Sequence, residues 1–194
     1  MYTSTSSSVS AILASYDFSP INQIVDNGQN LFVGEIFKVN SAIESILRNC
    51  AFAPRTAARP LIQGKNIADR YKCESEALAE SIPDDGDVYI MKNFIYNWNS
   101  DRTLNILKNC HQIMADRGRL LLLETAIPSF NKDNRRTTSR EWLDLTLFLM
   151  TGATSDRREA KYRQLLAKAG FKLAKVIYTQ SPIAAIEAVK VGDK

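Results

Sequence analysis

The sequence has little of what several classes of protein require. Its 194 residues include only three cysteines, Cys50, Cys73 and Cys110, which are widely spaced and form no C-x-x-C pair. This spacing argues against a disulfide framework and against a zinc site, and it is typical of buried thiols in a reducing compartment. No run approaches the roughly 20 apolar residues that span a bilayer, and residues 1–10 contain no apolar signal core. We therefore expect a cytoplasmic protein with no metal centre and no membrane contact.

Concentrated positive charge is also missing. The formal net charge is +4, but the lysines and arginines are scattered along the chain. A nucleic-acid surface requires a basic stripe with interleaved aromatic residues, so we expect no nucleic-acid partner.

Strand-like and helix-like segments alternate along the chain. Continuous apolar runs, typical of strands buried on both faces, occur at 21–26, 87–92 and 119–124. A serine and a glutamate at Ser41 and Glu44 form a capping-box pattern that predicts a helix running to about Asn49. This alternation favours an α/β fold with a mostly parallel sheet.

The second half of the chain continues the pattern. Leu104, Leu107, Cys110 and Met114 share one face at helical spacing, and a second helix ends at Gly170. Two strand-like segments follow at 171–178 and 183–189. The connection between them is too short for a parallel crossover, so we expect an antiparallel pair at the end of the chain.

Several blocks, in order, resemble the catalytic domain of the S-adenosylmethionine-dependent O-methyltransferases of plants and bacteria. They are Y-D-F-S at 16–19, I-V-D-x-G at 24–28, K-N-F-I-Y-N-W at 92–98, G-R-L-L-L-L-E at 118–124 and I-E-A at 186–188. The resemblance implies a Rossmann-like methyltransferase fold. We expect six or seven mostly parallel strands, an antiparallel C-terminal hairpin and helices on both faces, in a domain at 14–194 that follows a flexible segment at 1–13.

The same resemblance implies S-adenosylmethionine as cofactor, held by Asp26, Gly28 and Lys92. The family binds it at a glycine-rich turn after the first strand, where the backbone can approach the ligand closely. Only Gly28 remains in this turn, which we interpret as about eight residues longer than usual because the next predicted helix begins at Ser41. Two family acids, which would bind the ribose and lie near the adenine, correspond to Phe52 and Ala77.

The resemblance places the catalytic residues at Tyr96, Glu124 and Asp156. Tyr96 replaces the histidine that acts as general base, and a phenol with a pKa near ~10 is a poor base at neutral pH. Glu124 and Asp156 correspond to acids that orient the base, although either can equally cap a helix or pair on the surface. The one histidine, His111, lies off the apolar stripe and is interpreted as a surface residue rather than a relocated base.

These departures leave two main functions open, beside a non-methylating reaction on a small aromatic or polyketide-like substrate that no residue singles out. The first is an O-methyltransferase-like protein, acting on a small-molecule hydroxyl, whose activity is weak or lost. The second is a catalytically silent methyltransferase-fold module that acts through a protein partner, as a homodimer or with a helical partner protein. Methyl transfer can still proceed through proximity alone when the acceptor is already acidic, so the missing histidine does not decide between them.

Overall fold

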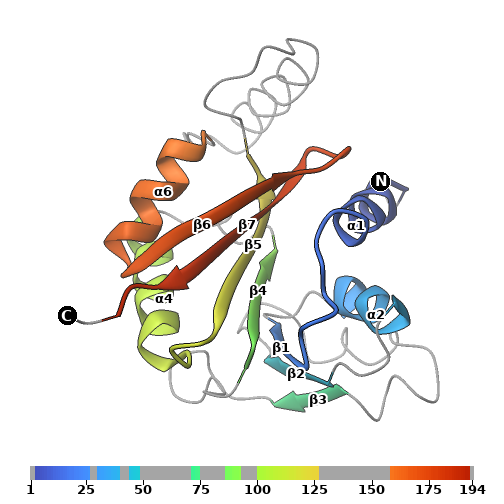
Figure 1. The fold of residues 1–194 in the computed structure, drawn as a ribbon, viewed down its shortest axis with the longest axis horizontal. Helices are drawn as coiled ribbons and strands as arrows, with labels where there is room; N and C mark the ends of the chain where they lie inside the picture. Colours follow the sequence, from blue (N-terminus) through green and yellow to red (C-terminus); the bar gives the residue numbers. More distant parts are fainter. Residues whose placement is uncertain are drawn as a thin grey trace.

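The computed structural model describes seven segments of the chain, at residues 3–26, 30–39, 44–48, 71–74, 86–92, 100–126 and 158–192. They contain one seven-stranded sheet with the strand order β3-β2-β1-β4-β5-β7-β6 (Figure 1). In chain order the strands are β1 (Gln23–Asp26), β2 (Glu44–Arg48), β3 (Tyr71–Glu74), β4 (Val88–Lys92), β5 (Arg119–Thr125), β6 (Phe171–Tyr178) and β7 (Ile183–Lys190). The first five pair in parallel, and β7 pairs antiparallel with both β5 and β6.

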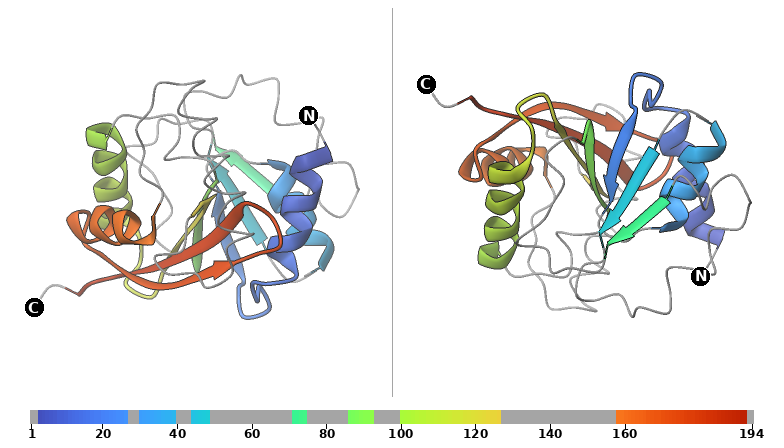
Figure 2. Two further views of the ribbon diagram at one scale, coloured as in Figure 1. Left: turned by 90° about the horizontal axis from the view of Figure 1, so that it is seen from above. Right: turned by 90° about the horizontal axis from the view of Figure 1, so that it is seen from below.

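Helices cover both faces of this sheet (Figure 2). They are α1 (Thr3–Leu13), α2 (Asn30–Val39), α4 (Ser100–Ile113) and α6 (Glu159–Lys168). Two apolar clusters form the core: α4 and α6 contribute to one of them and α1 and α2 to the other. None of the helices in the described segments is long and apolar enough to cross a bilayer. The sheet, its antiparallel hairpin and the two helical layers confirm the expected Rossmann-like architecture.

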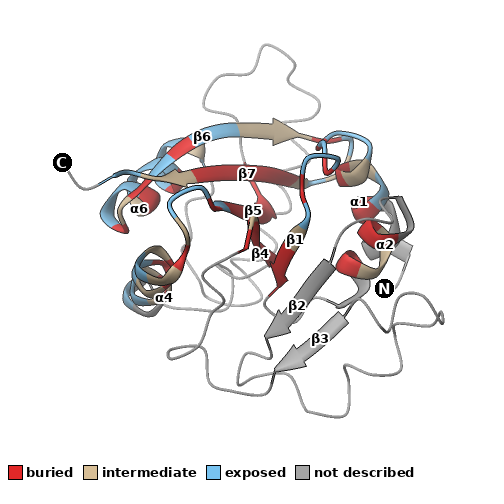
Figure 3. Ribbon diagram, turned by 60° about the horizontal axis from the view of Figure 1, so that its bottom comes forward, coloured by how far each residue is buried: buried red, intermediate tan, exposed pale blue. Residues whose placement is uncertain are grey.

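Strand alternation decides which residue belongs to which cluster. In β4, Tyr89 and Met91 face α4 and α6, whereas Val88 and Ile90 face α1 and α2. All four side chains are at most 5% exposed (Figure 3). Burying a large apolar side chain to this extent contributes roughly 1.5–3 kcal/mol, so the central strands hold the fold together.

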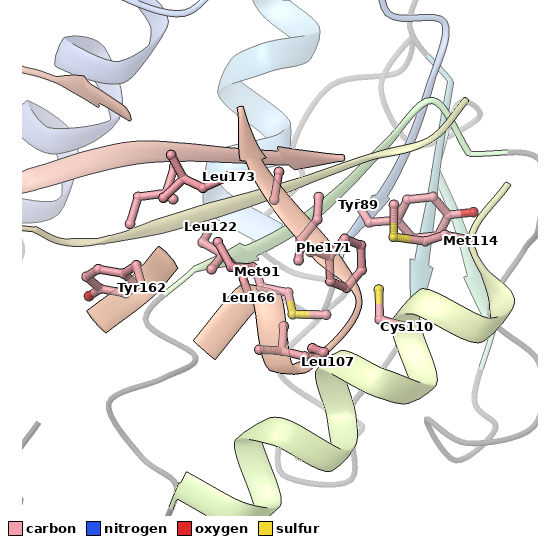
Figure 4. Close-up of a cluster of buried hydrophobic side chains, with 14 of the residues drawn as sticks. Tyr89, Met91, Leu107, Cys110, Met114, Leu122, Tyr162, Leu166, Phe171 and Leu173 are labelled. Atoms are coloured by element: carbon pink, nitrogen blue, oxygen red, sulfur yellow. The ribbon is translucent and has the colours of Figure 1, made fainter. Parts of the chain in front are cut away.

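The helical face predicted at 104–114 is the face that α4 buries. Leu107, Cys110 and Met114 are at most 2% exposed and lie against β4, β6 and α6 (Figure 4). Burial raises the pKa of the Cys110 thiol to about 12, so this cysteine stays neutral. The prediction of a buried thiol is confirmed for Cys110.

The region around residue 41 differs from the prediction. The helix expected from Ser41 to about Asn49 is absent, because Glu44–Arg48 form strand β2. β2 pairs in parallel with β1 on one side and with β3 on the other. Backbone hydrogen bonds to two neighbouring strands outweigh the local helix signal, which is a weak preference of a few tenths of a kcal/mol per residue. The helix of this region is α2, which comes earlier in the chain.

The N-terminal segment contributes a helix to the fold. Residues 3–13, within the segment expected to be flexible, form α1. Val9 and Ile12 of this helix are 4% and 0% exposed and pack in the cluster that contains α2. Helix α1 is therefore part of the packed fold.

Candidate functional site

The order in which the strands are added to the sheet reverses between β1 and β4, which are parallel neighbours. The connection after β1 enters α2 on one face, and α4, which follows β4, covers the other face. In open α/β sheets, ligands bind beyond the carboxyl ends of the two strands at such a switch point. The last residues of these strands are Asp26 and Lys92, two of the residues that the sequence predicts to hold the cofactor.

Asp26 and Lys92 are buried on the same face of the sheet. They are 1% and 7% exposed, and alternation places them on the side of Ile24, Val88 and Ile90. Burial lowers the pKa of Lys92, and the nearby Asp26 carboxylate acts in the opposite direction by stabilising the ammonium. A lysine at a strand end is commonly solvated, but Lys92 is buried and its pKa is influenced by the charge of the buried Asp26.

The turn after β1 is shorter than predicted. β1 ends at Asp26 and α2 begins at Asn30, so only residues 27–29 lie between them. The interpretation of a turn about eight residues too long was wrong, because it assigned the following helix to Ser41. The start of α2 therefore closely follows the end of β1, an arrangement that favours anionic ligand groups at a helix N-terminus. Gly28 itself lies outside the described residues.

The position assigned to the ribose acid also changes. β2 ends at Arg48, four residues before Phe52, so Phe52 does not directly follow this strand. The residue that does is Asn49, whose side chain is an amide with one acceptor oxygen rather than a carboxylate. Phe52, Asn49 and Ala77 lie outside the described residues.

Glu124 does not join Asp26 and Lys92. It is 0% exposed near the end of β5, and alternation places it on the side of Leu120 and Leu122, which face α4 and α6. The predicted site residues that the structure describes are therefore divided between the two faces of the sheet. The other two predicted catalytic residues, Tyr96 and Asp156, lie outside the described residues.

His111 lies at the other edge of the sheet. Its ring packs edge-to-face on Phe171 with the centroids 5.1 Å apart, and Phe171 begins β6 opposite Lys190, the last residue of β7. Val189, the neighbour of Lys190 on β7, pairs with Arg119, the first residue of β5. Lys92 pairs with Leu123, which lies four residues further along β5. Four residues of strand span about 13 Å. His111 is therefore too far away to replace a base at the carboxyl edge, although it is half-buried rather than fully at the surface.

A second polar cluster joins three of the sequence blocks that carry the resemblance, those at 16–19, 118–124 and 186–188. The Tyr16 hydroxyl donates a hydrogen bond of 2.6 Å to Glu187 Oε2, and both residues are buried. Arg119 and Lys175 each lie 3.8 Å from the Glu187 carboxylate. Burial and the neighbouring Glu187 raise the pKa of Tyr16. The only sequence signal for this cluster is a glutamate inside the apolar strand segment I-E-A.

Comparison with known proteins identifies the architecture. The family model described as an O-methyltransferase domain matches residues 1–172. The chain is 28% identical over 180 residues to phenazine O-methyltransferase PhzM of Lysobacter antibioticus, covering 92% of this chain and 51% of the relative. It is 29% identical over 166 residues to the mitomycin biosynthesis 6-O-methyltransferase of Streptomyces lavendulae, covering 84% and 45%. The chain thus spans about half the length of the curated relatives it matches.

Solved structures show the same fold. The crystal structure of LaPhzM matches with a TM-score of 0.81 at 28% identity, covering 96% of this chain and 55% of that one. CalO1, a methyltransferase of calicheamicin biosynthesis solved in its SAH-bound form, also matches with a TM-score of 0.81, at 22% identity and with 98% and 55% coverage. The second likeness supports the fold alone.

Proposed function

The chain belongs to the O-methyltransferase domain family, and from that premise we propose that it binds S-adenosylmethionine at the carboxyl edge of β1 and β4 but transfers its methyl group to a small-molecule hydroxyl weakly or not at all. One observation carries the first part of this proposal. It is the buried Asp26–Lys92 pair at the switch point of the sheet.

The charges of this pair fit the amino-acid end of the cofactor, which carries an ammonium and a carboxylate. Asp26 would accept hydrogen bonds from the ammonium, and Lys92 would donate to the carboxylate. The short connection into α2 adds helix N–H donors at the same edge. When bound, S-adenosylmethionine supplies a sulfonium methyl group for transfer to an oxygen nucleophile.

The proposed weakness of the reaction rests on where the sequence departs from the family pattern. One glycine stands in a turn where the family has three or four, so side chains limit how closely the backbone approaches the ligand. Tyr96 stands where the family has its histidine, and His111 lies at the opposite edge of the sheet. Glu124, on the other face, is proposed to stabilise the carboxyl edge rather than to take the proton.

Calorimetric titration with S-adenosylmethionine tests the binding step. We expect a dissociation constant in the millimolar range, about −4 kcal/mol, and no measurable binding by Asp26→Asn or Lys92→Met. Lys190→Met is the matched control, because Lys190 is also largely buried but interacts with Asp116 and the Met114 carbonyl. Equal binding by wild type and Lys92→Met would overturn the proposed site, and micromolar affinity would overturn the proposed weakness.

A methylation assay with two phenols distinguishes a weakly active enzyme from a catalytically silent module. A phenol with a pKa below neutrality needs no general base, so a weakly active enzyme is expected to methylate it slowly and an unactivated phenol not at all. If the chain binds the cofactor but gives no methylated product with either phenol, the silent module acting through a protein partner becomes the better proposal.

A further inference from the structure

A buried hydroxyl near the start of α4 has no protein partner. Thr103 is the fourth residue of this helix and is 1% exposed. In the part of the chain that the structure describes, its Oγ1 forms no hydrogen bond. Burying a hydroxyl in this way is unfavourable, because the group has lost its hydrogen bonds to solvent. Most buried polar groups in folded proteins are paired with a protein atom or an ordered water, so the Thr103 hydroxyl points to a small ligand.

Thr103 continues the buried face of α4 toward the carboxyl edge of the sheet. Figure 4 shows Met114, after the end of α4, beside Tyr89 of β4. Leu107 lies beside Met91, which is further along β4, so α4 runs antiparallel to this strand. Thr103 precedes Leu107 by one helical turn. It therefore lies about 6 Å beyond Leu107 in the direction of the carboxyl edge.

The same step along β5 leads to Glu124. Leu122 pairs with Met91, and Glu124 follows two residues later on the same face, about 7 Å closer to the carboxyl edge. Glu124 is 0% exposed. A carboxylate has about four acceptor positions, so Glu124 can accept a hydrogen bond in addition to those it already has. Thr103 and Glu124 therefore lie in one layer of the interior, on the helix side and on the strand side.

We propose that one water molecule binds between Thr103 Oγ1 and the Glu124 carboxylate, and that it links the start of α4 to the end of β5. The water donates to Glu124, and it pairs with Thr103, whose hydroxyl can donate or accept. Buried waters typically make about three hydrogen bonds to buried polar groups. The burial of both side chains favours a ligand of this size. The link is independent of methyl transfer and agrees with the stabilising role proposed for Glu124.

The variant Thr103→Val tests the site, because valine has the shape of threonine without its hydroxyl. If water joins Thr103 to Glu124, this variant loses a hydrogen-bonded link, and we expect its melting temperature to fall by about 2–4 °C. If the hydroxyl has no partner at all, its replacement relieves an unfavourable burial. An unchanged or higher melting temperature would therefore overturn the proposal.

A double-variant cycle tests whether the two residues share one ligand. Glu124→Met removes the carboxylate and keeps a side chain of similar length. We expect the double variant with Thr103→Val to lose about as much in melting temperature as the larger single loss, because either change releases the same water. Tyr16→Phe is the control partner for Glu124→Met, since Tyr16 bonds to Glu187 on the other face, and this pair should be additive. Additive losses for Thr103→Val and Glu124→Met would contradict a shared water.

A crystal structure of the full chain gives the direct measurement. We expect electron density for a water within about 3.2 Å of both Thr103 Oγ1 and a Glu124 carboxylate oxygen. The same density should be missing in Thr103→Val. A direct hydrogen bond between the two side chains, or a layer without water in the wild type, would show that the proposed link is wrong.

Discussion

Asp26 and Glu187 lie in the same row of the sheet, Asp26 at the end of β1 and Glu187 inside β7, and their surroundings differ. The row that joins them runs through four strands: Asp26 pairs with Ile90, Ile90 with Leu121, and Leu121 with Glu187. Both carboxylates are buried on the face covered by α1 and α2. The structure therefore places two acids on one face, with two apolar residues between them.

The difference lies in their partners. Glu187 receives a hydrogen bond from Tyr16 and lies near two half-exposed cations whose charges remain largely hydrated. The charge of Asp26 acts on Lys92, which is itself buried and whose pKa is lowered by burial. Two opposite charges that are both buried often add no net stability, whereas a satisfied buried hydrogen bond contributes. We infer that the Glu187 cluster stabilises the fold and that the Asp26–Lys92 pair is retained for binding.

The largest effect on the free energy of unfolding is expected from Tyr16→Phe. This variant removes the hydroxyl that donates to the buried Glu187 carboxylate, so the free energy of unfolding should fall by about 2 kcal/mol in urea titrations. Tyr178→Phe is the matched control, because the Tyr178 hydroxyl donates a longer bond of 3.2 Å to the half-buried Glu159. A loss no larger in Tyr16→Phe than in Tyr178→Phe would contradict the structural role of this cluster.

An intermediate effect on the free energy of unfolding is expected in alkaline solution. The pKa of Tyr16 is raised above its ordinary 10.0, so between pH 10 and 11 the unfolded chain loses this proton while the folded chain keeps it. The free energy of unfolding should therefore fall, by up to about 1.4 kcal/mol per pH unit, and Tyr16→Phe should lack this fall.

Lys92 changes the free energy of unfolding with pH in the opposite direction. Its folded pKa lies below 10.5, so its contribution to stability rises with pH below that value, and Lys92→Met should lack the rise.

The smallest effect on stability is expected from the double variant Asp26→Asn/Lys92→Met. Removing both buried charges relieves their desolvation, so the free energy of unfolding should stay within about 1 kcal/mol of wild type or increase. Binding of S-adenosylmethionine should nevertheless be lost in calorimetry. A loss of more than about 2 kcal/mol would show that this pair, like the Glu187 cluster, stabilises the fold, and the contrast between the two acids would disappear.

Much of the fold follows from local patterns in the sequence. The apolar runs predicted β4 and β5 to within one residue at each end, and the spacing of Leu107, Cys110 and Met114 predicted the buried face of α4. The short connection before Ile183 correctly predicted the antiparallel hairpin. These elements are determined by burial patterns that a single segment displays.

The errors have a common physical cause. Residues 44–48 form a strand because β1 and β3 supply backbone partners, and neither partner is visible from the segment itself. Because residues 44–48 were assigned to a helix, the predicted turn after β1 was too long, and the end of the second strand, where the family has its ribose acid, was misplaced. Likewise, Tyr16 and Glu187 are 171 positions apart, so their hydrogen bond depends on the tertiary fold.

The length of the three-residue connection between β1 and α2 bears on the weak cofactor binding proposed above. Because its length already matches a compact strand-to-helix link, no insertion or deletion is needed, and single replacements such as Gln29→Gly can be introduced while the flanking elements keep their register. Under the proposed function, tighter binding of S-adenosylmethionine can then be sought by point substitutions in this connection, one at a time.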